Sequence, residues 1–220
     1  MELREAIRTR RSIRWFLPKP VSKQIIQELI GESLWAPSWA NTQPWEIIVV
    51  TGEPLERFKK ENKEALLAGQ TSIPDIPMPT RWPEALNNRS RDLFKTLFET
   101  LAIDQDAERR LDYYARMYYL FDASALILVL IDKELSLEYA MLDVGIFLQT
   151  FLLLAHNAGL GACVFSGTVH CPEIAHRHFA IPDTKLLVMG VVLGWPDMDA
   201  PINNFVRKRR HVEESVRWIP

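Results

Sequence analysis

Apolar residues change from a helical to a strand-like spacing within the first fifty positions. In residues 2–9 two apolar side chains lie four positions apart, which predicts a short helix with one apolar face. Ser22 is a suitable N-cap for a second amphipathic helix, which we expect to end before Pro37. Residues 45–50 are rich in β-branched side chains, so we expect a strand there.

Several later segments are apolar almost without interruption. Residues 123–131 and 186–194 are apolar on both faces, which is typical of central strands that helices cover on both sides. Residues 162–168 predict a further strand, and residues 172–180 predict a helix. Together these elements predict an α+β or three-layer α/β fold with about four strands.

Residues 137–158 predict a long helix that is apolar nearly all the way round, with Ser136 as a suitable N-cap and Gly159 as the C′ residue. The segment is long enough for a membrane, but Asp143 and His156 would be costly in lipid. A helix this apolar must be buried against a large surface, and we predict that it forms a subunit interface.

The chain from about residue 65 to residue 120 departs from the sheet-and-helix pattern. Residues 54–68 predict a helix, but residues 69–83 contain four of the fourteen prolines and cannot form a helix interior. Residues 84–119 return to helical composition. The aromatic group that follows is more typical of a core than of substrate contacts and consists of Tyr113, Tyr114, Tyr118, Tyr119 and Phe121. We interpret residues 65–120 as a lid within a single domain spanning residues 1–220.

Composition narrows the class of protein. With 220 residues, 48% of them apolar, the chain can bury a full core without metals or disulfides. A net charge of −2 argues against a general nucleic-acid or membrane-surface role. Cys163 and Cys171 are the only cysteines, so there is no disulfide framework and no zinc pattern. The first residues lack the apolar run of a signal peptide, and we expect a cytoplasmic protein.

Two basic segments are the strongest candidates for ligand binding. Arg10, Arg11 and Arg14, with Ser12 between them, offer three guanidinium groups and a hydroxyl within five residues, which suits a doubly charged phosphate. Residues 207–210 form the second basic segment. Taken alone, each is more often a solvated stretch, and the second also resembles a tail that attracts nucleic acid.

Other polar residues have a plain structural alternative. Ser38 and Asn41 lie in a polar loop, where they also suit a helix C-cap and a turn. His176 and His178 are two positions apart and do not share a helix face, so we assign no metal site. Cys163 lies in an apolar strand with no demonstrable base, so we do not assign it as a nucleophile.

Five motifs follow one another in a fixed order along the whole chain. They are Arg10-Arg-Ser-Ile-Arg14; Trp35-Ala-Pro-Ser-Trp-Ala-Asn-Thr-Gln-Pro-Trp45; Asp143-Val-Gly-Ile-Phe-Leu-Gln149 with Gly159-Leu-Gly161; Ile181-Pro182 with Leu193-Gly-Trp-Pro196; and the basic segment 207–210. Each motif alone is weak, but together they resemble the FMN-dependent nitroreductase family, and in particular its nitrobenzoate-reductase-like branch with a large lid. The resemblance implies a mixed central sheet flanked by helices, in a domain-swapped homodimer with FMN at the subunit interface.

The resemblance also implies FMN as the cofactor and NAD(P)H as the reductant. It assigns FMN binding to residues of four segments, namely Arg10, Arg11, Ser12 and Arg14; Pro37, Ser38, Trp39 and Asn41 from the partner subunit; Phe165, Ser166 and Gly167 near the flavin N5; and Arg207 and Arg209. A register shift of one residue would place Lys208 and Arg210 in the last group instead.

The implied activity is a ping-pong cycle in which a nicotinamide reduces FMN and a nitroaromatic, a quinone or a similar small electrophile is then reduced. The cofactor carries this chemistry, so we assign no catalytic side chain. The chain has Ser166 where many relatives carry an acidic residue, and Trp39 where many carry a small one. Two alternatives stay open: a dehalogenase or deiodinase-like flavoenzyme, and a flavin-binding dimer without nicotinamide turnover. No nucleic-acid or membrane partner is expected.

Overall fold

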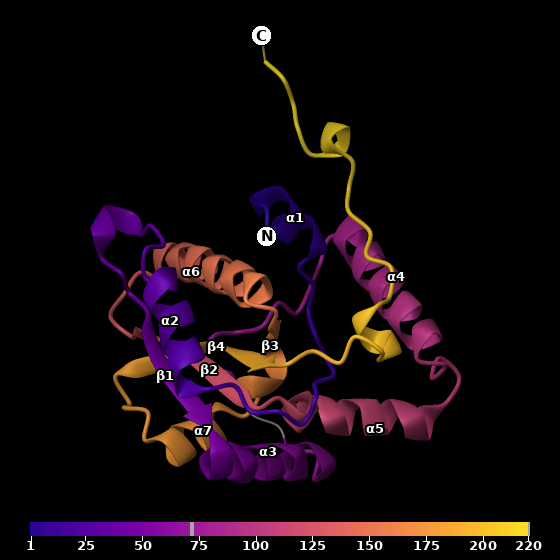
Figure 1. Cartoon of the computed structure of the whole chain (residues 1–220), viewed down its shortest axis with the longest axis horizontal. Coiled ribbons are helices and arrows are strands. Elements are labelled where there is room, and N and C mark those ends of the chain that lie inside the picture. The colour runs from indigo at the N-terminus through magenta and orange to yellow at the C-terminus, as the bar shows by residue number, and fades with distance from the viewer. Residues whose placement is uncertain (71–72, 220) are drawn as a thin grey trace.

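A four-stranded sheet forms the centre of the protein in the computed structural model, which describes residues 1–70 and 73–219 (Figure 1). The strand order is β1-β2-β4-β3, and every neighbouring pair is antiparallel. The strands are β1 (Glu46–Thr51), β2 (Ala125–Asp132), β3 (Gly161–Phe165) and β4 (Lys185–Gly194). All four lie where the sequence predicts strands.

The direction of the strands differs from the expected mixed sheet. Among the described residues, parallel pairing is confined to the isolated bridge of Ser12 with Ala162 at the β3 edge. There the backbone N–H of Ile13 donates to the Ala162 carbonyl at 3.1 Å. The first basic run, residues 10–14, therefore lies beside β3 and is joined to it by a single β-bridge. It is not a fifth strand, because a strand requires several consecutive bridges.

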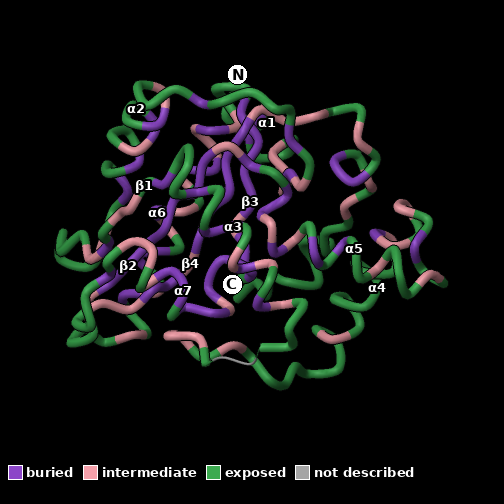
Figure 2. Tube along the Cα trace, turned by 90° about the horizontal axis from the view of Figure 1, so that it is seen from below, coloured by how far each residue is buried: buried purple, intermediate pink, exposed green. Residues whose placement is uncertain are grey.

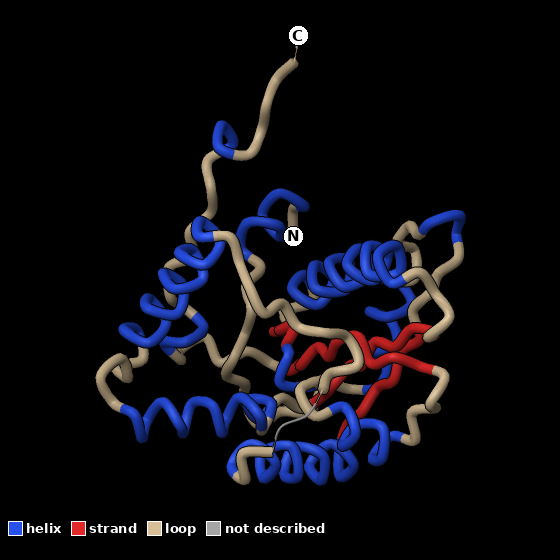
Figure 3. The backbone as a smooth tube through the Cα atoms, turned by 180° about the vertical axis from the view of Figure 1, so that it is seen from behind, coloured by secondary structure: helices blue, strands red, loops and turns tan. Residues whose placement is uncertain are grey.

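Helices cover both faces of the sheet (Figures 1 and 3). One face packs against α2 (Lys23–Ser33) and α6 (Leu137–Asn157). The other packs against α3 (Gly52–Leu67) and α7 (Pro172–Phe179). Because both faces are covered, all but the last residue of β2 are buried, as the unbroken apolar run predicts.

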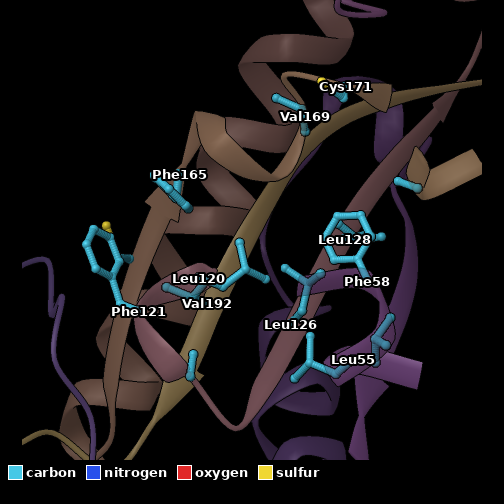
Figure 4. Packing of buried hydrophobic residues seen from close by; sticks show 14 of the residues in the cluster. Leu55, Phe58, Leu120, Phe121, Leu126, Leu128, Phe165, Val169, Cys171 and Val192 are labelled. Atoms are coloured by element: carbon cyan, nitrogen blue, oxygen red, sulfur yellow. The ribbon is translucent and has the colours of Figure 1, made fainter. Parts of the chain in front are cut away.

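Alternation along the strands divides the core into two sides. Ile127 of β2 packs toward α2 and α6, whereas Leu126 and Leu128 pack toward Leu55 and Phe58 of α3 (Figure 4). Successive side chains of a strand point to opposite faces, which accounts for this division. Figure 2 shows the buried residues gathered around the sheet and the exposed ones along the outer helices.

The helix ends lie at the residues that the sequence predicts. Ser22 caps α2 by accepting a hydrogen bond from the N–H of Ile25 at 3.3 Å. Gly159 follows α6 with φ of +77°, as a C′ glycine does. Ser136 occupies the predicted N-cap position of α6, although its hydroxyl donates to Glu138 at 3.1 Å instead of capping the backbone. The neighbouring carboxylate competes for the hydroxyl.

Short elements complete the fold. The predicted strand 162–168 stops at Phe165 and continues as the 3₁₀ turn η3 (Ser166–Thr168). The remaining elements are α1 (Leu3–Thr9), η1 (Trp39–Asn41), η2 (Leu120–Asp122), η4 (Pro201–Asn203) and η5 (Val212–Glu214). Residues beyond about 206 run away from the body toward the C-terminus (Figures 1 and 3).

The excursion consists of two helices outside the sheet layers. They are α4 (Glu84–Thr100) and α5 (Ala107–Tyr118), and Asp106 caps α5 by accepting from the N–H of Arg109 at 2.9 Å. Leu97 and Tyr113 attach the two helices to the core on the α3 side of the sheet. Residues 71 and 72 of the predicted proline-rich loop lie outside the described residues, and residues 73–83 form neither a helix nor a strand.

Candidate functional site

A cavity of about 760 Å³ opens between α4, the first basic run and the C-terminal segment. Figure 1 shows this segment running beside α4 after it leaves the sheet. The cavity is lined by the first basic run, by one face of α4 and by the second basic segment with its neighbours: Arg10, Arg11, Ser12, Arg14, Arg89, Asp92, Leu93, Thr96, Phe205, Val206, Arg207, Lys208, Arg209, Arg210 and Glu214. The two basic segments, almost 200 positions apart in sequence, therefore share one site.

Ile13 fixes the first basic run against the edge of the sheet. Its side chain is 5% exposed and packs over Gly161, where a Cβ would lie 2.7 Å from it. Only glycine at this position leaves room for the isoleucine. With Ile13 anchored, Ser12 and Arg14 on either side of it are left at the cavity.

Asn203 holds the two basic segments together, and sequence reasoning did not identify it. Its side chain is fully buried and makes three hydrogen bonds: Oδ1 accepts from the N–H of Arg14 at 2.8 Å, and Nδ2 donates to the carbonyls of Trp15 at 2.8 Å and Asp197 at 2.7 Å. Its own carbonyl accepts from the Arg11 guanidinium at 2.6 Å. No local pattern marks it, because all but one of its partners are about 190 positions away.

Arg207 holds the start of the first basic run by hydrogen bonds to backbone carbonyls. Its guanidinium donates to the carbonyls of Arg8 at 2.9 Å, Thr9 at 3.4 Å and Arg10, at the C-terminal end of α1. A cation at this end of a helix satisfies free carbonyls and complements the helix dipole. Arg207 thus stabilises the turn that presents Arg10 to the cavity.

Arginines in this site repel one another. Burial lowers the pKa of Arg10, and the nearby positive charge of Arg209 lowers it further. Burial likewise lowers the pKa of Arg207, with Arg11, Arg209 and Arg10 as further causes. Of the cavity arginines, only Arg210 forms an ion pair within residues 1–70 and 73–219, with Glu214. A site with this much unpaired positive charge fits a phosphate dianion, and so it fits the phosphate of FMN.

The loop carrying Pro37, Ser38, Trp39 and Asn41 does not line this cavity. The Trp39 N–H donates to the buried carboxylate of Asp143 at 3.0 and 3.2 Å, which ties the loop to the first half of α6. The other end of α6 carries His156, whose Nε2 lies 2.8 Å from the hydroxyl of Thr9, beside the basic run. Thirteen residues of helix separate Asp143 from His156, or about 20 Å.

Within the loop, Ser38 and Asn41 form a turn, which is the structural alternative that the sequence allows for them. The Ser38 hydroxyl accepts from the N–H of Gln43 at 2.9 Å, and Asn41 adopts φ of +59°. The Trp39 ring is 62% exposed and contacts Tyr139 of α6 edge-on, with centroids 4.7 Å apart. The loop is thus held in place while its tryptophan stays accessible.

Phe165, Ser166 and Gly167 also lie outside the lining of the cavity. A Cβ on Gly167 would lie 2.4 Å from the ring of Phe165, so the glycine is required by its own neighbour. Ser166 is exposed, and the Gly167 carbonyl accepts from Asn62 at 3.0 Å. Phe165 contacts Phe121 at 5.5 Å (Figure 4), and the buried Tyr113, Tyr118 and Phe121 confirm the core interpretation for most of that aromatic group.

The two histidines of α7 are engaged by separate carboxylates. His176 lies 2.8 Å from Asp75, and His178 lies 2.6 Å from Glu61. Within the part of the chain that the structure describes, no three His, Cys, Asp or Glu side chains are grouped to hold a metal. Cys163 and Cys171 are both buried as free thiols.

Comparison with known proteins places the chain in a family. The model of the Nitroreductase family matches residues 7–195, and the chain belongs to this family. It is 31% identical to a nitrobenzene nitroreductase of Ectopseudomonas oleovorans, over 98% of this chain and 96% of that protein. It is also 31% identical to a 4-nitrobenzoate reductase of Pseudomonas putida, over 97% and 93% respectively.

A solved structure shares the fold. The FMN-dependent nitroreductase NfnB from Mycobacterium smegmatis, solved in complex with NADPH, superposes with a TM-score of 0.93. It is 22% identical, and the match covers 99% of this chain and 97% of that one. The likeness extends to α4 and α5, because nearly the whole chain is covered.

Proposed function

We propose that the protein is an FMN-dependent NAD(P)H oxidoreductase that reduces nitroaromatics, quinones or similar small electrophiles. The cluster of arginines in one cavity carries this proposal, because all of them but Arg210 lack an ion-pair partner among the described residues and their charge matches a phosphate. Membership of the Nitroreductase family, with relatives named for nitrobenzene and nitrobenzoate reduction, supports the substrate class.

The proposed FMN site combines segments of two subunits. Arg10, Arg11, Ser12 and Arg14, with Arg209 beside Arg10, bind the phosphate and the pyrimidine edge, and Arg207 holds their backbone. Residues 165–167 contribute backbone near the flavin N5. When bound, FMN supplies the hydride-transfer chemistry, so the chain's own task is to bind and orient.

We further propose a homodimer in which loop 37–41 of the second copy completes the site. The separation of about 20 Å along α6 keeps this loop from the basic run of its own chain. The expected interface is apolar and open: Tyr139 and Leu142 of α6 are 51% and 61% exposed, and Trp218 near the C-terminus is 86% exposed. Exposed apolar side chains that lie together on one face, as Tyr139 and Leu142 do on α6, suit a surface that a partner covers.

The same interface accounts for the composition of α6. Among the described residues, α6 is the helix long and apolar enough to cross a membrane by length and composition. Its buried Asp143 is bound to the loop at Trp39, and its inner face packs on the sheet, which suits a soluble dimer. We therefore propose one cytoplasmic domain spanning residues 1–220, with the lid at about 65–120.

Anaerobic spectroscopy of the purified protein tests this proposal. We expect FMN absorbance, bleaching on addition of NADH or NADPH, and recovery of the oxidised spectrum with nitrobenzene or a quinone. A protein that never binds FMN contradicts the proposal. Bound FMN that neither nicotinamide reduces favours the non-catalytic dimer, and recovery with halogenated tyrosines but not with nitrobenzene favours the deiodinase-like alternative.

A further inference from the structure

One face of α4 forms the wall of the cavity opposite the phosphate-binding arginines. Arg89, Asp92, Leu93 and Thr96 line it, and their spacing of three, four and seven positions places them on one helix face. Arg89, Asp92 and the neighbouring Arg91 are all exposed, but Arg91 lies outside the lining. The lid therefore presents a cation, a carboxylate, an apolar side chain and a hydroxyl to any ligand in the cavity.

The cavity holds more positive charge than one FMN phosphate requires. Eight Lys and Arg side chains line it against two carboxylates, and one of these carboxylates, Glu214, is paired with Arg210. A phosphate monoester carries only about two negative charges. Arg89 stands apart from the two basic segments and has no ion-pair partner within residues 1–70 and 73–219. The charge on α4 is thus available for a second anion.

We propose that Arg89 and Asp92 form a second subsite, which selects NADPH over NADH through the 2′-phosphate of the adenosine ribose. This inference rests on the proposed function. The planar fork of a guanidinium matches a phosphate, whereas a carboxylate accepts hydrogen bonds from a free ribose diol and repels a phosphate. Arg89 therefore favours NADPH, Asp92 favours NADH, and the surplus of positive charge in the cavity sets the preference toward NADPH.

Substitutions at the two positions should shift this preference in opposite directions. With nitrobenzene as a neutral oxidant, we expect Arg89→Gln to lower the ratio of kcat/KM for NADPH to that for NADH about tenfold or more, as loss of a charge-assisted contact does. Asp92→Asn should raise the same ratio. Arg91→Gln is the matched control on the same helix and should leave the ratio unchanged, because Arg91 lies outside the cavity lining.

Equilibrium binding gives a readout independent of turnover. Calorimetric titration of the FMN-loaded and FMN-free protein with 2′,5′-ADP and with 5′-AMP should show that Arg89→Gln weakens only the former. The FMN dissociation constant should stay within about twofold of the wild-type value, since the arginines proposed to bind the FMN phosphate line the other wall of the cavity.

Three results overturn the inference while leaving the proposed function intact. In the first, Arg89→Gln and Asp92→Asn shift the ratio in the same direction or not at all. In the second, Arg89→Gln weakens FMN as much as 2′,5′-ADP, which makes Arg89 part of the cofactor clamp. In the third, Arg89→Gln raises the KM for 4-nitrobenzoate but not for NADPH, which assigns the subsite to a substrate carboxylate. Failure to bind FMN at all counts against the proposed function instead.

Discussion

At the scale of single residues, the sequence identifies charges more readily than it identifies what holds them. Arg10, Arg11 and Arg14 stand out because three guanidinium groups in five positions are unusual, and the structure places them in one cavity with residues 207–210. Asn203 carries no such signal. Asn203 acquires its role only when folding brings Arg14 and Trp15 to it. No short stretch of the sequence contains both Asn203 and these partners, so a local pattern cannot reveal the role.

Replacing Asn203 tests whether it positions the basic run. Asn203→Ala removes the side-chain partner of the Arg14 N–H and of the Asp197 carbonyl, and one of the two donors to the Trp15 carbonyl. A hydrogen-bonding group left unpaired costs about 1–3 kcal/mol when it is buried, so we expect a lower Tm and weaker FMN binding. Asn204→Ala is the control, because Asn204 is the exposed neighbour. Thermal unfolding and fluorescence titration with FMN measure both effects. If Asn203→Ala lowers Tm while FMN affinity is retained, Asn203 stabilises the fold without positioning the site.

Arg10 should matter for FMN binding but not for the stability of the FMN-free protein. Burial and the nearby charge of Arg209 both lower the pKa of Arg10, so its surroundings in the FMN-free protein do not favour the charged form. We expect Arg10→Ala to weaken FMN binding by about 1.5–3 kcal/mol, the range for a charge-assisted contact, without lowering the Tm of the FMN-free protein. Unchanged FMN affinity would show that Arg10 does not contact the phosphate.

At the scale of elements, period and capping residues predict where helices and strands lie but not how strands pair. All four strands and the amphipathic helices follow from their hydrophobic spacing. The strand directions do not follow from that spacing, because they depend on which strands become neighbours in the folded sheet. Phe165 also ends its strand earlier than the apolar pattern predicts, since the chain turns at Ser166 to place the Phe165 ring over Gly167.

The C-terminal end of α6 should make stability depend on pH. Burial lowers the pKa of His156, and the positive charges of Arg10, Arg207 and Arg11 contribute to the same shift. The unfolded chain therefore takes up a proton before the folded one does, and stability falls as the pH drops through about 6.5 and on toward the lower folded-state value.

Thermal unfolding of the FMN-free protein between pH 8 and pH 5 measures this effect. We expect a smaller loss of Tm on acidification in His156→Gln than in the wild type, because the substituted side chain does not titrate. FMN should also reduce the wild-type loss, since its phosphate offsets the arginines around His156. Equal pH dependence in the two proteins would contradict the assignment to His156.

At the scale of the whole molecule, one chain supplies only part of the proposed site. The lid and the two basic segments meet in the cavity, while loop 37–41 is fixed near Asp143 at the far half of α6. The motifs predict both parts, but the separation between them becomes visible only in the fold. The proposed second copy, packed along the exposed face of α6, would remove this separation by bringing its own loop to the basic run.

A single charge on α6 tests that arrangement. Leu142 is 61% exposed in one chain, so Leu142→Asp should be harmless to a monomer but should bury an unpaired carboxylate in the proposed interface. We expect a folded monomer that has lost FMN, because half of the site is lost with the partner.

Leu67→Asp is the control: Leu67 is 54% exposed at the end of α3, on the opposite face of the sheet. Light scattering after size exclusion gives the mass, and absorbance gives the bound FMN. A Leu142→Asp protein that remains a dimer with FMN would remove α6 from the interface, and a wild-type monomer that holds FMN would show that one chain completes the site.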